Sequence, residues 1–368
     1  MAETTSTVME TSTDPCTLGS NIAMVRRLRG VSQDVLAQEI DVTRQTLASY
    51  EKDTTSPSTA VVRRIAKALE FPFEPLFNEI KPFDLFNYGF KVIDSSFEKS
   101  VQYRREASLD DEILDMVKHV AFDKIRYVLE LEDILDSKIE FVNPVKSMGD
   151  IDSKDKAEEA ALEVRRKWGI YENPFANVVG VLENRGVKVV EFRGPAGFEG
   201  LSARYDGNPI VVLNSAIEEV TRKRFTALHE LGHLILQIPK HVKYEVVESI
   251  CNAFASMLIL PKELLWRELG QARSGISLQE LNLIKQKYGI SIRAILVSAA
   301  FANIISWEKK RLILEELDGK SIVNFSGDET ALRHKQLLYR AVAENKIGQD
   351  KYEQLGGSVD MFNELIAL

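Results

Sequence analysis

The chain has 368 residues, of which 45 % are hydrophobic and 28 % charged, and this length suffices for two or three domains with separate cores. Its two cysteines, Cys16 and Cys251, exclude a disulfide framework and a multi-cysteine zinc site, and they fit a reducing cytoplasm. No apolar run approaches the roughly 18 residues of a membrane span, so we expect no membrane association. A net charge of -8 gives no general attraction to nucleic acid, so DNA binding would require a local surface.

The first 79 residues divide into a tail and a helical module. Residues 1–16 are rich in Thr, Ser and Glu and lack the basic start and apolar core of a signal peptide, so we expect a disordered tail. In residues 17–79, apolar side chains recur at three- and four-residue spacing, which predicts a compact set of short helices. Ser32 and Thr43 are the expected N-caps of the second and third helices.

Residues 32–51 predict two helices joined by a tight turn. The second helix displays side chains that can hydrogen-bond base edges and phosphates, namely Arg44, Gln45, Thr46 and Ser49. This segment resembles the helix-turn-helix of the lambda-repressor-like (Xre) family. The resemblance implies a five-helix domain that binds operator DNA, in which these four residues read the major groove and Gln33 touches backbone or bases.

The charge of the predicted module limits its expected affinity for DNA. Residues 17–80 contain equal numbers of basic and acidic side chains. We therefore expect modest binding, which a homodimer would strengthen. The alternative is a helical protein-interaction module that has kept this fold.

Residues 80–152 are expected to form a helical connector, because apolar residues there fall close to helical spacing. No pattern in this region suggests chemistry. A domain boundary is predicted near 152, after the loop signals that begin at Asn143-Pro144. Three strand-like runs follow within residues 153–268, at 187–192, 201–205 and 209–213. Asp206-Gly207 predicts a hairpin between the last two, and hence a small antiparallel sheet with an edge strand that can pair with an extended peptide.

The run that ends in His229-Glu230-Leu231-Gly232-His233 carries the strongest chemical signal. It lacks proline and places Phe225, Leu228 and Ile235 on one side, which predicts a helix. On a helix the two imidazoles project from one face, about 6 Å apart at Cβ, and can share one metal ion. Glu230 lies one step round the helix and could reach a water on that metal.

A catalytic zinc ion needs three protein ligands and one open position, so a third ligand is expected from the following helix. Glu245 and Glu248 both qualify. We favour Glu248, because Asn252 lies four residues further on the same face and can support a ligand from behind. Cys251 is interpreted as a small core residue of this apolar helix rather than a ligand or a redox switch.

Residues 154–261 resemble the ImmA/IrrE family of metallopeptidases through their strands, their H-E-L-G-H helix and the helix that follows. Departures are slight: Ala227-Leu228 stands where the family usually has the reverse order, and Cys251 where alanine is common. The resemblance implies a zincin-like Zn²⁺ endopeptidase that cleaves a repressor protein, with His229, His233 and Glu248 as ligands. Glu230 would be the general base. The oxyanion donor stays open among Tyr244, His241 and Arg204.

Residues 269–368 are predicted to be helical and to brace the peptidase domain, dimerise it or bind a partner. The expected fold class is therefore α+β and mostly α. The leading functional hypothesis is a cytoplasmic zinc endopeptidase coupled to a DNA-binding domain, which regulates transcription by cleaving a repressor. Two rivals remain: a DNA-binding regulator or antitoxin-like protein whose zinc site is structural or sensory, and a metallohydrolase with a non-peptide substrate.

Overall fold

The computed structural model describes residues 17–29, 31–78, 95–103, 111–194, 197–318, 320 and 322–366. The tail expected at 1–16 lies outside these residues. The chain separates into two compact units, 1–92 and 93–368, and each is treated by itself.

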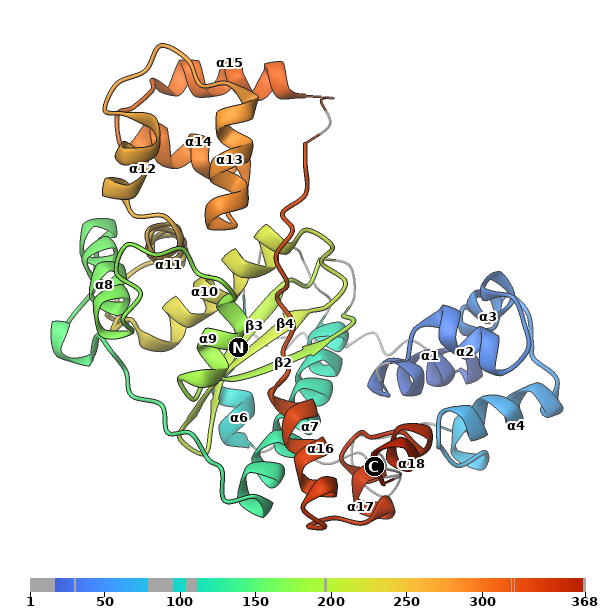
Figure 1. Ribbon diagram of the computed structural model, residues 1–368. Helices are drawn as coiled ribbons and strands as arrows, with labels where there is room; N and C mark the ends of the chain where they lie inside the picture. The colour runs from blue at the N-terminus through green and yellow to red at the C-terminus, as the bar shows by residue number, and fades with distance from the viewer. Residues whose placement is uncertain are drawn as a thin grey trace, which may run out of the picture. The chain divides into compact units, whose positions relative to one another are not determined.

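The first unit is a small helical domain (Figure 1). Its elements are α1 (Leu18–Leu28), α2 (Gln33–Glu39), α3 (Arg44–Glu51), α4 (Thr59–Ala68) and the 3₁₀ helix η1 (Glu74–Phe77). The side chains of Ser32 and Thr43 accept hydrogen bonds from the backbone N–H groups of Val35 and Thr46, so both expected caps are present. A single apolar core joins the helices, with Ile22, Leu36, Leu47 and Ile65 among its buried residues.

A four-stranded sheet lies at the centre of the second unit, in the order β1-β3-β4-β2. The strands are β1 (Gln102–Tyr103), β2 (Lys188–Phe192), β3 (Gly200–Tyr205) and β4 (Asn208–Asn214). Strands β3 and β4 form the expected antiparallel hairpin, and both turn residues have positive φ, 49° at Asp206 and 74° at Gly207. This is the conformation that Asp-Gly turns favour.

The sheet differs from the expected antiparallel one in two respects. Strand β2 pairs with β4 in parallel, because the β3–β4 hairpin returns β4 to β2 in the same direction, so the sheet is mixed. Strand β1 comes from the predicted connector and pairs antiparallel with the outer edge of β3, with Gln102 opposite Ser202 and Tyr103 opposite Leu201. The edge expected to be free is thus covered at these two positions.

Helices cover both faces of the sheet (Figure 1). Along β4, Val211 and Leu213 join one core and Ile210 and Val212 join the other, as the two-residue period of a strand requires. The first core contains α8 (Lys154–Lys167), α9 (Val178–Asn184), α10 (Val220–Ile235) and α11 (Tyr244–Ile259). The second contains α6 (Ser95–Ser100), α7 (Asp111–Ile134) and α16 (Arg333–Ala343). Burial on both faces explains why all of β4 is buried.

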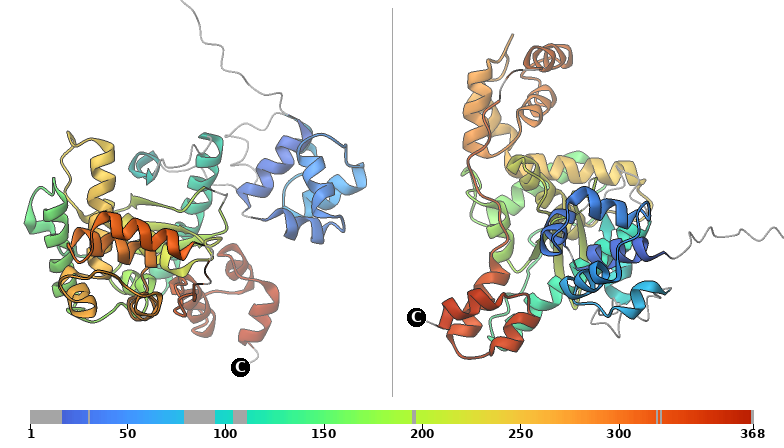
Figure 2. Two further views of the ribbon diagram at one scale, coloured as in Figure 1. Left: turned by 90° about the horizontal axis from the view of Figure 1, so that it is seen from above. Right: turned by 90° about the vertical axis from the view of Figure 1, so that its right-hand side faces the viewer.

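The remaining helices form two groups. The first group consists of α12 (Lys262–Leu269), α13 (Leu278–Tyr288), α14 (Ile292–Phe301) and α15 (Trp307–Leu317). The second consists of α17 (Gln349–Gln354) and α18 (Val359–Ile366), which follow α16. A short 3₁₀ helix, η2 (Lys146–Met148), precedes α8. Figures 1 and 2 show α12–α15 and α16–α18 on opposite sides of the sheet. Residues 322–332, here called the strap, run between them without a helix. The mostly helical α+β class is confirmed, and none of the described helices is long and apolar enough to cross a bilayer.

Candidate metal centre

Helix α10 presents two histidines from a buried position on the sheet. Leu228, Leu231 and Ile235 anchor the helix in the core with at most 1 % of their surface exposed. The side chains of His229 and His233 are 2 % and 7 % exposed. Their four-residue spacing places the rings on one face, with the two Nε2 atoms 3.0 Å apart.

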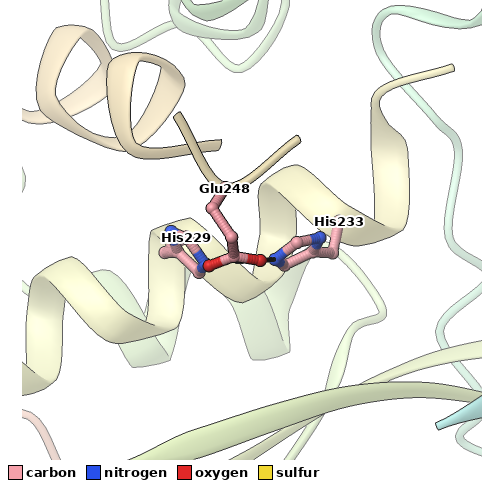
Figure 3. Close-up of side chains that lie close together, drawn as sticks. All are labelled: His229, His233 and Glu248. Carbon is pink, nitrogen blue, oxygen red and sulfur yellow. Dashed lines mark hydrogen bonds and ion pairs between the residues drawn. The ribbon is translucent and has the colours of Figure 1, made fainter. Parts of the chain in front are cut away.

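Helix α11 brings Glu248 to the same point (Figure 3). One carboxylate oxygen lies 3.3 Å from Nε2 of His229 and the other 3.1 Å from Nε2 of His233. Asn252, one turn further along α11, has its Oδ1 3.0 Å from Nδ1 of His229. A single turn of α11 therefore supplies an acid to the two histidines and holds one of them from behind.

The chemistry and spacing of this trio fit a metal ion. Ligands at zinc-like bond lengths of 2.0–2.1 Å in a tetrahedral arrangement lie about 3.3 Å apart. The three observed separations, 3.0, 3.1 and 3.3 Å, are close to this value. If Nδ1 of His229 donates to Asn252, its Nε2 carries a lone pair aimed at the second ring and at a carboxylate. A cation at this point would convert those repulsions into bonds.

The electrostatics of the trio also favour a positive charge. Burial lowers the pKa of His233, but hydrogen bonds to Cys251 and Glu248 and the charge of Glu230 outweigh it and raise the pKa to about 10. Burial likewise raises the pKa of Glu248, whereas its hydrogen bonds to His229 and His233 bring it well below its usual range. The buried carboxylates and the sulfur around the two imidazoles thus favour a positive charge at this point.

Glu230 lies beside the trio, on the side of the sheet. Its side chain is 1 % exposed, and Oε2 has no hydrogen-bond partner among the described residues. Burial raises its pKa, against the opposing effects of the two imidazoles and of Ser202 on β3. A buried carboxyl with a raised pKa, and with one oxygen that has no partner among the described residues, is suited to accept and release a proton.

The other candidates of the metallopeptidase domain lie further out. Glu245, the alternative to Glu248, is exposed at the start of α11. Tyr244 is 44 % exposed and shares the face of Glu248, one turn before it. His241 is exposed in the loop between α10 and α11. Arg204 donates a hydrogen bond to the carbonyl of Leu234, so its guanidinium binds the end of α10.

The candidate DNA-reading residues lie on α2 and α3 of the first unit. Arg44 and Gln45 are exposed, and Thr46 and Ser49 are half-buried. Arg44 has a long ion pair of 3.6 Å with exposed Asp34, which leaves the guanidinium accessible to other groups.

Gln33 differs from these residues. Its amide donates to Glu51, 2.7 Å away, and the same carboxylate forms a buried ion pair with Arg26 at 2.5 Å. This amide is therefore oriented by the core of the unit.

Two neighbours of the site had no functional role in the sequence interpretation. The sulfur of Cys251 lies 3.5 Å from Nδ1 of His233, although an apolar helix position indicated packing alone. Gly200 allows β3 to approach α10, since a Cβ there would lie 2.8 Å from Thr226 and 3.6 Å from Glu230. The sequence signal for Gly200 was its position at the start of a strand, where a glycine often marks a close approach.

An H-E-x-x-H helix on a sheet, with an acid from the next helix, is the arrangement of a metal-dependent peptidase domain. Comparison with known families agrees with this class. Residues 182–299 match the IrrE N-terminal-like domain of the M78 peptidases, and residues 22–76 match a helix-turn-helix family. The resemblance stated from the sequence is thereby confirmed: the chain combines a helix-turn-helix DNA-binding domain with an IrrE N-terminal-like, M78 peptidase domain.

No curated protein matches the chain. Among solved structures, PlcR of Bacillus thuringiensis, in complex with the peptide PapR7 and DNA, is 12 % identical, with 95 % of each chain covered and a TM-score of 0.15. ComR of S. thermophilus, in its apo form, is also 12 % identical, with 95 % of this chain and 99 % of that chain covered and a TM-score of 0.16. Scores this low do not establish a common fold.

Proposed function

We propose that this protein is a zinc-dependent endopeptidase that regulates transcription by cleaving a repressor protein, and that its helix-turn-helix domain binds operator DNA. The observation that carries the proposal is the convergence of His229, His233 and Glu248, with the buried carboxyl of Glu230 beside them. A structural zinc site is closed by four protein ligands, whereas three ligands leave one position open for substrate.

The residues would divide the chemistry as follows. His229, His233 and Glu248 would hold Zn²⁺, and Asn252 would fix the ring of His229. When bound, Zn²⁺ polarises a carbonyl and makes water acidic enough to lose a proton near pH 7.

Glu230 would take a proton from the attacking water as the water oxygen adds to the carbonyl carbon of the peptide bond. The same carboxyl would then deliver that proton to the amine nitrogen as the C–N bond breaks. Its raised pKa, and the absence of a partner for Oε2 in the described part of the chain, support both roles.

The decisive test is Glu230→Gln in the full-length chain. We expect about one zinc per chain in both proteins, because the substitution leaves all three ligands in place. Cleavage of a helix-turn-helix repressor encoded beside this gene should fall by at least about 10²-fold, the lower range for loss of a general base. Metal content by mass spectrometry and product bands on a gel are the readouts. Cleavage that survives the substitution would refute the mechanism.

A second candidate is a DNA-binding regulator with a structural or sensory zinc site and no proteolysis. The observation in its favour is β1, which pairs with the outer edge of β3 where an extended peptide was expected. This candidate predicts operator binding that changes when zinc is removed, and no cleavage of the repressor by the wild-type protein. A gel-shift titration with and without chelator, run beside the cleavage assay, separates the two candidates.

A further inference from the structure

The two histidines of α10 are both contacted from behind by α11. Each ring turns Nε2 towards Glu248 and leaves Nδ1 on its far side. Nδ1 of His229 meets Oδ1 of Asn252 at 3.0 Å, and Nδ1 of His233 meets Sγ of Cys251 at 3.5 Å. Cys251 and Asn252 are consecutive, three and four residues after Glu248, so the same turn of α11 contacts both rings.

The contact between Cys251 and His233 occurs in a closely packed place. Cys251 has no exposed surface. A Cβ on Gly232, the residue before His233, would lie 3.2 Å from Phe254 and 3.4 Å from the sulfur of Cys251, so a side chain there would require Phe254 to shift slightly. The two helices therefore approach closely here, and little space surrounds the sulfur.

The geometry excludes the sulfur as a ligand of an ion held by the trio. Cys251 lies on the Nδ1 side of His233, whereas Glu248 and the second ring lie on the Nε2 side. A ring that binds a metal through Nε2 carries its proton on Nδ1, and this N–H needs an acceptor when it is buried. A thiol sulfur is a weak acceptor, but it is an acceptor.

We infer that Cys251 is a positioning residue: its sulfur accepts the Nδ1–H hydrogen bond of His233 and so presents the Nε2 lone pair of that ring to the metal. The inference rests on the metal site of the proposed function but not on proteolysis. Asn252 has the same relation to His229, and the two residues together would fix both rings. Packing alone would require only the volume of the Cys251 side chain.

Three substitutions separate acceptor from volume. Cys251→Ala removes the acceptor, Cys251→Val removes it while filling the space, and Cys251→Ser keeps an acceptor in a smaller side chain. The affinity for Zn²⁺ is measured by competition with a chromophoric chelator, and thermal unfolding of the metal-free proteins is measured separately. Cys16→Ser is the matched control for the loss of a thiol.

If Cys251 positions His233, both Ala and Val weaken zinc binding about tenfold, the lower end for loss of an outer hydrogen-bond partner, and Ser restores it to within about threefold. If it only packs, Ala and Ser, which are nearly equal in size, bind zinc equally tightly, which would overturn the inference while leaving the proposed function intact. If Ala does not fold, Val takes its place as the variant without an acceptor, and Val binding zinc as tightly as Ser would overturn the inference. A wild-type chain that binds no zinc would overturn the inference and the proposed function together.

Discussion

Glu183 at the end of α9 is a buried acid whose ionisation is coupled to folding. Its carboxylate accepts the backbone N–H groups of Leu332 and Arg333, at 3.3 and 3.1 Å, where the strap meets α16. Glu183 is only 7 % exposed, and this burial raises the pKa of its carboxyl from 4.5 to about 7. A raised pKa means that the folded chain holds this proton more tightly than the unfolded chain does.

The stability contributed by protonated Glu183 is therefore fully present below about pH 4.5 and is lost as the pH rises through about 7. Relative to Glu183→Gln, which does not titrate, the free energy of unfolding of the wild type should fall by about 2–3 kcal/mol between pH 5 and pH 8. Urea unfolding followed by tryptophan fluorescence measures the free energy of unfolding of the second unit at each pH. All three tryptophans, Trp168, Trp266 and Trp307, lie in this unit. Parallel pH curves for the two proteins would contradict the prediction.

At the scale of single residues, the sequence predicted what depends on short spacing. The four-residue step from His229 to His233 places both rings on one helical face whatever surrounds the helix. The role of Cys251 could not be predicted, because contact with His233 depends on how closely two helices pack. The buried pair of Arg224 and Glu329 was also out of reach, since its partners are 105 residues apart.

At the scale of elements, β1 is the feature that bears most directly on substrate access. Beside its two pairings with β3, Ser100 just before it exchanges hydrogen bonds with the backbone of Arg204, at 2.7 and 2.9 Å. The segment thus follows the outer edge of β3 from 201 to 204. A peptide could pair with that stretch only after β1 leaves it.

Gln102→Pro should free this edge, because proline cannot take part fully in a strand ladder. If the repressor binds by strand pairing, kcat/KM for its cleavage should rise up to about tenfold, which corresponds to the roughly 1.4 kcal/mol of one or two net hydrogen bonds. Zinc affinity should not change. Lys99→Ala, an exposed position on α6, is the control. An unchanged or lower kcat/KM would show that the substrate does not use this edge.

The elements that the sequence predicted well are those whose signal is local. The Asp206-Gly207 turn determines the β3–β4 hairpin through its own backbone preference. The parallel pairing of β2 with β4 depends on which strand lies next to which after the hairpin forms, and no local pattern encodes it. The amphipathic pattern of α7 likewise predicted a helix, but it did not predict that this helix packs on one face of the sheet.

At the scale of the whole second unit, the core is wider than the segment that carries the motif. The core on one face of the sheet includes Val117 and Ile125 of α7 and Leu337 and Val342 of α16. These residues lie outside 182–299, the interval that matches the IrrE N-terminal-like domain. That interval expressed alone would leave one face of its sheet uncovered.

The strap, which runs between α15 and α16, contacts α10, the helix that carries His229 and His233. Glu329 of the strap forms a fully buried ion pair with Arg224 of α10, and its carboxylate also accepts the N–H groups of Val178 and Val179 at 2.9 and 2.8 Å. Lys223, the residue before Arg224 on α10, donates to the carbonyl of Glu329 at 2.8 Å. Removing one partner from such a buried pair costs about 3–5 kcal/mol.

By thermodynamic linkage, any ion that binds α10 more tightly when the strap is docked must also make the strap harder to detach. Free zinc at 100 times its dissociation constant would suppress such opening by up to about 2.7 kcal/mol, or roughly 100-fold. Amide hydrogen exchange at Val178 and Val179 should slow accordingly when zinc is added and recover with a chelator. Exchange that ignores zinc would show that the strap opens with α10 intact. If exchange slows, zinc binding at the trio stabilises the docked strap through Arg224 rather than through a strap residue of the trio. A partner that binds the detached strap would then bind less tightly when zinc is present.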